Sequence, residues 1–110
     1  MIAPSHVSPK FRPGQLVRHK RYGYRGVVVE FDLSCQASDE WYSSNQTQPL
    51  RDQPWYHVLV HGTPTVTYAA QTSLEEDPDR EPVEHPLISA FFSGFTGTGY
   101  IRNERPWPEG

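Results

Sequence analysis

The clearest strand in the chain reads Val27-Val28-Val29-Glu30-Phe31-Asp32. Three β-branched residues followed by alternation are typical of a strand that is buried on one face and partly on the other. A second strand reads Trp55-Tyr56-His57-Val58-Leu59-Val60, and the turn His61-Gly62-Thr63-Pro64 leads it into a third, Thr65-Val66-Thr67-Tyr68-Ala69-Ala70. A connection this short predicts that the second and third strands form an antiparallel hairpin.

Shorter elements flank these strands. A Pro13-Gly14 turn precedes a short strand over residues 16–19, and Ser38 suits the N-cap of a short helical turn. Late in the chain, aromatic and aliphatic residues recur at helical spacing after His85-Pro86, which predicts one helix within residues 86–95. The apolar face of that helix comprises Leu87, Ile88, Phe91, Phe92 and Phe95. Residues 100–101 add a last short strand.

Composition supports a small β domain. The chain has 110 residues, which fits one domain, and 35% of them are hydrophobic, with 11 prolines, which disfavours a helical bundle. Three Trp, six Tyr and five Phe supply large buried surfaces and argue against disorder. We therefore predict a mainly β protein, a small SH3-like antiparallel β barrel with one short late helix. Its expected core comprises Val17, Val28, Val58, Val60, Val66 and Tyr68, with Phe91, Phe92 or Phe95 packing from the helix.

Charge is unevenly distributed along the chain. Residues 1–29 contain six lysines and arginines and no acid, whereas residues 72–86 contain six acids and one arginine, although the net charge is only −3. Such asymmetry indicates an oriented interaction with a polar or anionic partner. We expect the acidic stretch to be a solvated loop that leaves stability nearly unchanged when its charges are removed. The alternative is that these acids are structural and pair with the basic segment.

The residues do not assemble into a recognisable catalytic or metal site. Cys35 is the single cysteine, so no internal disulfide can form and no Cys-x-x-Cys motif exists for zinc. His57 and His61 are four residues apart without further ligands in the pattern, and the acids at 77, 79 and 81 lack the glycine and glutamate of a calcium loop. We expect no cofactor, no metal and no enzymatic activity. The opening lacks a signal peptide and no apolar run could span a membrane, so we expect a cytoplasmic protein without membrane contact.

Several blocks together resemble a known family, the YccV-like or hemimethylated-DNA-binding domain. They are residues 18–28, Asp32 with Cys35, residues 53–60, residues 68–71 and the late segment 85–101. The resemblance covers roughly residues 11–103, flanked by an expected flexible arm, 1–10, and a flexible tail, 104–110. The late segment is similar to the version of the domain found at the C-terminus of an animal F-box protein. Bacterial heat-shock protein Q is similar in the earlier blocks.

The resemblance implies a non-enzymatic binding module with one of two functions. The first is binding of DNA, hemimethylated DNA included, through a basic hairpin in which cations alternate with aromatic rings. Its candidate contacts are Arg18, His19, Lys20, Arg21, Tyr22, Tyr24 and Arg25. The second is a protein-binding adaptor that helps a protease or a ubiquitin ligase select substrates. Its candidate contacts are Trp41, Glu75, Glu76 and Asp77, with the edge of the strand at residues 66–70.

Overall fold

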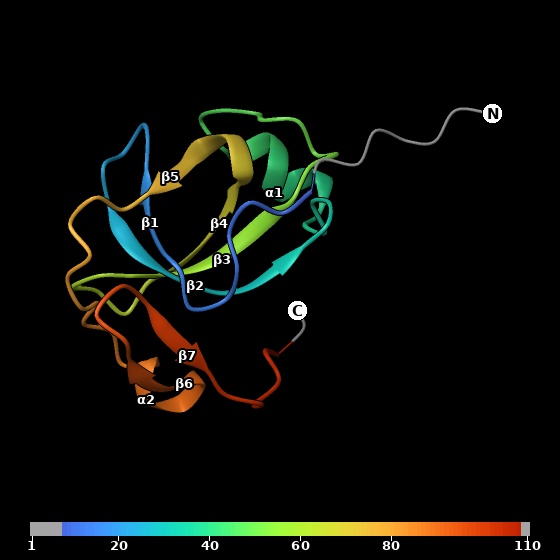
Figure 1. Ribbon diagram of the computed structural model, residues 1–110. Helices are drawn as coiled ribbons and strands as arrows, with labels where there is room; N and C mark the ends of the chain where they lie inside the picture. Colours follow the sequence, from blue (N-terminus) through green and yellow to red (C-terminus); the bar gives the residue numbers. More distant parts are fainter. Residues whose placement is uncertain (1–7, 109–110) are drawn as a thin grey trace.

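The computed structural model describes residues 8–108 and shows a mainly β protein built from antiparallel strands. Five strands form one sheet in the order β4-β3-β2-β1-β5, and two more form a separate hairpin, β6-β7 (Figure 1). The strands of the large sheet are β1 (Leu16–His19), β2 (Arg25–Asp32), β3 (Trp55–Val60), β4 (Val66–Ala70) and β5 (Leu74–Glu76). The fold class predicted from the sequence is confirmed, and so is the β3–β4 hairpin.

The large sheet curls around one core while its two edge strands stay unpaired with each other. One apolar cluster unites residues from all five strands, among them Val17, Val28, Val58, Ala69 and Leu74. The edge strands β4 and β5 are connected by a short 3-10 helix, η1 (Gln71–Ser73). The sheet is therefore strongly curved around this core, but β4 and β5 do not pair to close it into a barrel.

A β-bulge explains the three consecutive valines of β2. The register of β2 against β3 shifts between Val28 and Glu30, so Val29 is the extra residue. Val27 and Val29 pack with Leu16 and Leu59 on the outer face of the sheet, whereas Val28 faces the inner core. All three valines are thereby fully buried.

Helix α1 (Asp39–Ser44) lies in the long connection between β2 and β3. As predicted, Ser38 is its N-cap, and the hydroxyl accepts a hydrogen bond from the Trp41 amide at 3.2 Å. Trp41 packs edge-on against Trp55, which is 2% exposed and fills a third apolar cluster. The helix thus covers one end of the sheet.

The predicted helix within residues 86–95 is wrong in its extent. Only α2 (Ile88–Phe91) is helical, and the chain continues as β6 (Phe92–Phe95), which pairs with β7 (Tyr100–Arg102). Asn103 caps the end of this helix: its backbone amide donates to the Phe91 carbonyl at 2.8 Å and its side-chain amide donates to the Ala90 carbonyl at 2.9 Å. Phe91 and Phe92 are buried as expected, but Phe95 is 37% exposed.

The expectation of a solvated acidic loop is wrong for its first part, whereas Asp79, Arg80 and Glu81 are exposed in a loop as expected. The first part forms η1 and β5, and β5 pairs with β1. Asp77, directly after β5, is only 4% exposed. The remaining core prediction holds for Val17, Val28, Val58 and Val60, while Val66 and Tyr68 are half-buried.

The described residues of the expected arm and tail make contacts with the domain. Residues 1–7 of the arm and 109–110 of the tail lie outside the described residues. Within the described part, the Lys10 amide donates to the buried Gln71 side chain at 2.8 Å. Trp107 packs on Phe91, with ring centroids 5.1 Å apart. Between residues 8 and 108, no helix is long and apolar enough to cross a membrane.

Candidate functional site

The β1–β2 hairpin projects from the sheet through a tight turn. The His19 amide donates to the Tyr24 carbonyl at 2.8 Å, and the Gly23 amide donates back to the His19 carbonyl at 2.9 Å. Gly23 has a φ of 77°, a conformation that side chains rarely adopt, so glycine is needed at this point. We call residues 20–22, which stand beyond these bonds, the hairpin tip.

His19 supports the tip from beneath. Its Nδ1 accepts hydrogen bonds from the amides of Arg21 at 3.2 Å and Tyr22 at 3.1 Å, so this nitrogen carries no proton. Its ring stacks on Tyr22 with centroids 4.6 Å apart and lies 5.0 Å from the Tyr24 ring. Burial, and secondarily the charge of Arg21, lower the pKa of His19 below its ordinary value. The imidazole is therefore neutral at pH 7 and positions the tip instead of adding a charge to it.

The tip presents two cations and one aromatic ring to solvent. Lys20 and Arg21 are exposed, and within residues 8–108 neither forms an ion pair. Tyr22 is 53% exposed, and the Arg21 guanidinium lies 5.8 Å from the centroid of its ring. This arrangement can bind phosphate with the cations and a base or sugar with the ring.

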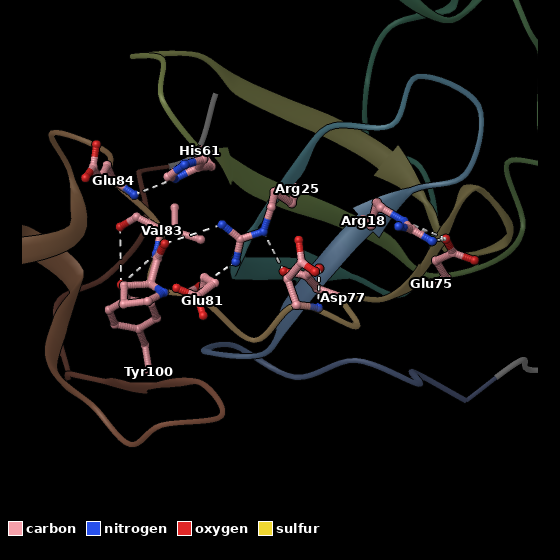
Figure 2. A network of polar contacts seen from close by, with 11 residues as sticks. Arg18, Arg25, His61, Glu75, Asp77, Glu81, Val83, Glu84 and Tyr100 are labelled. Atoms are coloured by element: carbon pink, nitrogen blue, oxygen red, sulfur yellow. Dashed lines mark hydrogen bonds and ion pairs between the residues drawn. The ribbon is translucent and has the colours of Figure 1, made fainter.

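Arg18 and Arg25 are directed toward the acidic segment instead of toward the tip (Figure 2). Arg18 forms an ion pair with Glu75 at 2.8 Å, and both side chains are about 40% exposed. Arg25 pairs with Asp77 at 2.7 Å, where the Arg25 side chain is 15% exposed and that of Asp77 is 1% exposed. The second alternative from the sequence, that acids pair with the basic segment, is the one that the structure shows.

Arg25 also holds the chain that follows Asp77. Its guanidinium donates to the Glu81 carbonyl and, at 3.4 Å, to the Pro82 carbonyl. Asp77 accepts a further bond from the Asp79 amide at 3.1 Å. Figure 2 shows these contacts as one network beside the hairpin. Glu76 is the exposed member of the acidic residues proposed for protein docking.

A cleft of about 470 Å³ adjoins the tip. Its walls bring together His19, Tyr22 and Tyr24 from the hairpin, Trp41 from α1, and strand β4. Tyr24 donates to or accepts from Thr67 at 2.8 Å, and Tyr22 donates to Gln46 at 3.3 Å. The structure thus unites residues that the sequence suggested for two different functions, DNA binding and protein binding.

Some lining residues were missed from the sequence. Gln46 is one of them, because amide-rich loops are common in any protein and carry no motif, whereas Thr67 belongs to the strand edge at residues 66–70 that was expected to bind a protein. Tyr68 was expected in the core and within the strand edge at residues 66–70, and the structure shows it half-buried and lining the cleft. Burial and its hydrogen bond to Asp32, at 2.6 Å, raise the pKa of Tyr68 above the ordinary value, so the phenol stays protonated.

The remaining reactive residues do not converge. Between residues 8 and 108, no group of three or more His, Cys, Asp or Glu residues could hold a metal ion. Cys35 is a buried thiol in the cluster around Trp55. His61 accepts a hydrogen bond from the Glu84 amide at 2.9 Å, and the His57 Nε2 lies 3.6 Å from an Asp32 carboxylate oxygen.

The chain matches a known protein family and is similar to several known proteins. Residues 9–99 match the family described as hemimethylated DNA-binding protein YccV like. The chain is also similar to F-box only protein 21 of Homo sapiens and of Pongo abelii, each 39% identical over 93 residues. The protein of that name from Mus musculus has the same identity over the same length. The match covers 82% of this chain but only 15% of each relative.

Proposed function

The chain belongs to the YccV-like family of hemimethylated-DNA-binding domains, and from this premise we propose that it is a non-enzymatic module that binds DNA through the hairpin tip. One observation supports this most strongly: Lys20 and Arg21 are exposed and, in the described chain, unpaired beside the exposed ring of Tyr22. Arg18 and Arg25, by contrast, attach the hairpin to the acidic segment through their ion pairs with Glu75 and Asp77.

The local charge of this surface suits an anion although the whole chain has a net charge of −3. The residues lining the cleft and the smaller hollow next to it include both tip cations and no carboxylate. In the adjoining acidic segment, Glu75 and Asp77 are each paired with an arginine, whereas the exposed Glu76 forms no ion pair among residues 8–108 and is not part of the cleft or hollow lining. A phosphate backbone approaching the tip therefore meets positive charge.

Two phosphate contacts predict modest affinity. Each contact adds about 0.9 to the slope of log K against log salt for duplex DNA, so two give a slope of about −1.8. Raising the salt from about 50 to 200 mM then weakens binding about tenfold. Selectivity for hemimethylated DNA would come from the apolar face of Tyr22 against a base methyl group, because phosphates carry no sequence information.

The test is a salt-dependent anisotropy titration with unmodified, hemimethylated and fully methylated duplexes. Lys20→Ala and Arg21→Ala should each weaken binding to all three duplexes and reduce the slope by about one unit. Arg12→Ala is the matched control, because it removes an exposed arginine away from the tip and should leave the slope unchanged. Equal binding by the tip variants and the parent protein would contradict the proposal.

A second candidate function is that of a protein-binding adaptor in regulated proteolysis. The observation that favours it is the aromatic cleft beside the tip, in which Trp41 and Tyr68 lie with ring centroids 5.7 Å apart. The likeness to F-box only protein 21 supports the same candidate and suggests a ubiquitin-ligase component as partner. Loss of a protein partner on Trp41→Ala, with only mild salt dependence, would distinguish this function from DNA binding.

A further inference from the structure

Strand β4 is an edge strand with one side of its backbone unpaired. Among the described residues it pairs only with β3. At its two ends, Thr65 accepts from the Val60 amide at 3.1 Å and Gln71 donates to the Pro54 carbonyl at 2.9 Å. Because antiparallel strands alternate between bonded and non-bonded pairs, the odd-numbered residues face β3. The amides and carbonyls of Val66, Tyr68 and Ala70 therefore point away from the sheet.

Strand β4 itself carries no lysine, proline or bulge that would prevent pairing. Proteins protect edges with lysine, proline, bulges, very short strands or a covering segment. The sequence of β4 is Val-Thr-Tyr-Ala-Ala, and its register against β3 is regular. The opposite edge, β5, is protected, since it has three residues and two of them are Glu75 and Glu76. The two edges of one sheet thus differ in their ability to accept another strand.

The aromatic cleft surrounds the unpaired edge. Residues from both faces of β4 line it: Thr67 on the face that contacts Tyr24, and Tyr68 on the face that contacts Trp41 and Trp55. A cleft lined from both faces of an edge strand contains the edge itself. Ala70 is 1% exposed, so the accessible part of the edge extends from Val66 to Tyr68.

We propose that this edge accepts a short, extended and acidic peptide segment of a partner protein as an additional strand. The backbone groups of Val66 and Tyr68 would supply ladder hydrogen bonds, and alternate peptide side chains would enter the two walls of the cleft. The peptide is expected to be acidic because Lys20 and Arg21 line the smaller hollow next to the cleft. No carboxylate lines either the cleft or this hollow. The inference rests on the second candidate function, protein binding, and does not require DNA binding.

Hydrogen exchange of the unliganded protein tests the edge first. The amides of Thr67 and Ala69 should exchange slowly, because they face β3, whereas those of Val66 and Tyr68 should exchange quickly. Equal protection of all four amides would overturn the proposal. This measurement needs no variant, so it does not depend on whether a substituted protein folds.

The binding probe is a fluorescein-labelled peptide, Asp-Asp-Val-Thr-Val-Thr-Val, titrated by anisotropy. Binding should slow the exchange of the Val66 and Tyr68 amides, and Val66→Pro should weaken it about tenfold by removing one donor and blocking the strand. Proline is tolerated on an edge strand whose amide faces solvent, and the melting temperature checks this. Val66→Ala, which removes the same side chain but keeps the amide, is the matched control and should bind the peptide more tightly than Val66→Pro.

Three results would overturn the proposal. They are no binding of the probe at 1 mM peptide, equal binding by Val66→Pro and the parent protein, and equal binding when both aspartates of the probe are replaced by lysine. Titrating the same variants with duplex DNA distinguishes peptide binding from DNA binding. Val66→Pro should leave duplex binding unchanged, whereas Lys20→Ala should weaken it. Protection of the Val66 and Tyr68 amides by duplex DNA and not by the peptide would assign the edge to DNA and contradict the inference.

Discussion

The buried ion pair between Arg25 and Asp77 should be a main determinant of stability. Asp77→Ala removes the partner of a guanidinium whose side chain is only 15% exposed and also removes the acceptor of the Asp79 amide. Breaking such a pair from one side costs about 3–5 kcal/mol, because the largely buried guanidinium keeps its carbonyl acceptors but loses its counter-charge. With an m-value of about 2 kcal/mol/M, the urea midpoint of unfolding should fall by about 2 M.

The matched control is Glu75→Ala, which removes the other ion pair of the same segment. The side chains of that pair are 43% and 38% exposed, so the expected loss is about 1 kcal/mol or less. Replacing both Arg25 and Asp77 by apolar residues should restore part of the loss seen with Asp77→Ala alone. Urea titrations followed by tryptophan fluorescence measure all three variants. If Asp77→Ala unfolds at the same urea concentration as Glu75→Ala, the structural role of the pair is refuted.

Three further predictions concern single residues. The pKa of His19 is lowered in the folded protein, so the unfolded chain binds a proton at this residue more readily. The free energy of unfolding should therefore decrease as the pH falls below about 6.5. In pH-dependent thermal melts, His19→Gln should show less of this decrease. Gly26→Ala should lower the free energy of unfolding by about 2 kcal/mol or more, because the added Cβ would lie 2.3 Å from the Leu59 carbonyl oxygen. An unchanged urea midpoint of unfolding would show that β2 and β3 can move apart to make room for it. Tyr68→Phe should cost about 1–3 kcal/mol by leaving the half-buried Asp32 carboxylate without its 2.6 Å hydrogen bond, and a melting temperature equal to that of the parent protein would contradict this.

The strands were predictable because they follow local patterns. Alternation, β-branched runs and turn residues are encoded within a few positions, and they correctly located β2, β3 and β4. The late helix was overextended because the aromatic spacing of residues 87–95 fits one helical face. The last carbonyls of α2 are capped by Asn103, which lies outside the periodic segment.

The site was predictable in its residue types but not in its pairings. The basic and aromatic residues of the hairpin stand out in the sequence, and the structure places three of them, Lys20, Arg21 and Tyr22, together at the exposed tip. The partners of Arg18 and Arg25 are 57 and 52 residues away, and no local pattern specifies which acid reaches which arginine. The open edge of β4 is likewise a property of the sheet order.

Backbone amide chemical shifts of the ¹⁵N-labelled protein, followed during titration with a hemimethylated duplex, test DNA binding by the hairpin tip most directly. The account predicts that the largest changes fall on Lys20, Arg21 and Tyr22, and that they decrease as the salt is raised from about 50 to 200 mM. It also predicts little change at Arg12, which is exposed and basic but away from the tip. An unperturbed tip, or changes of the same size at Arg12, would contradict it.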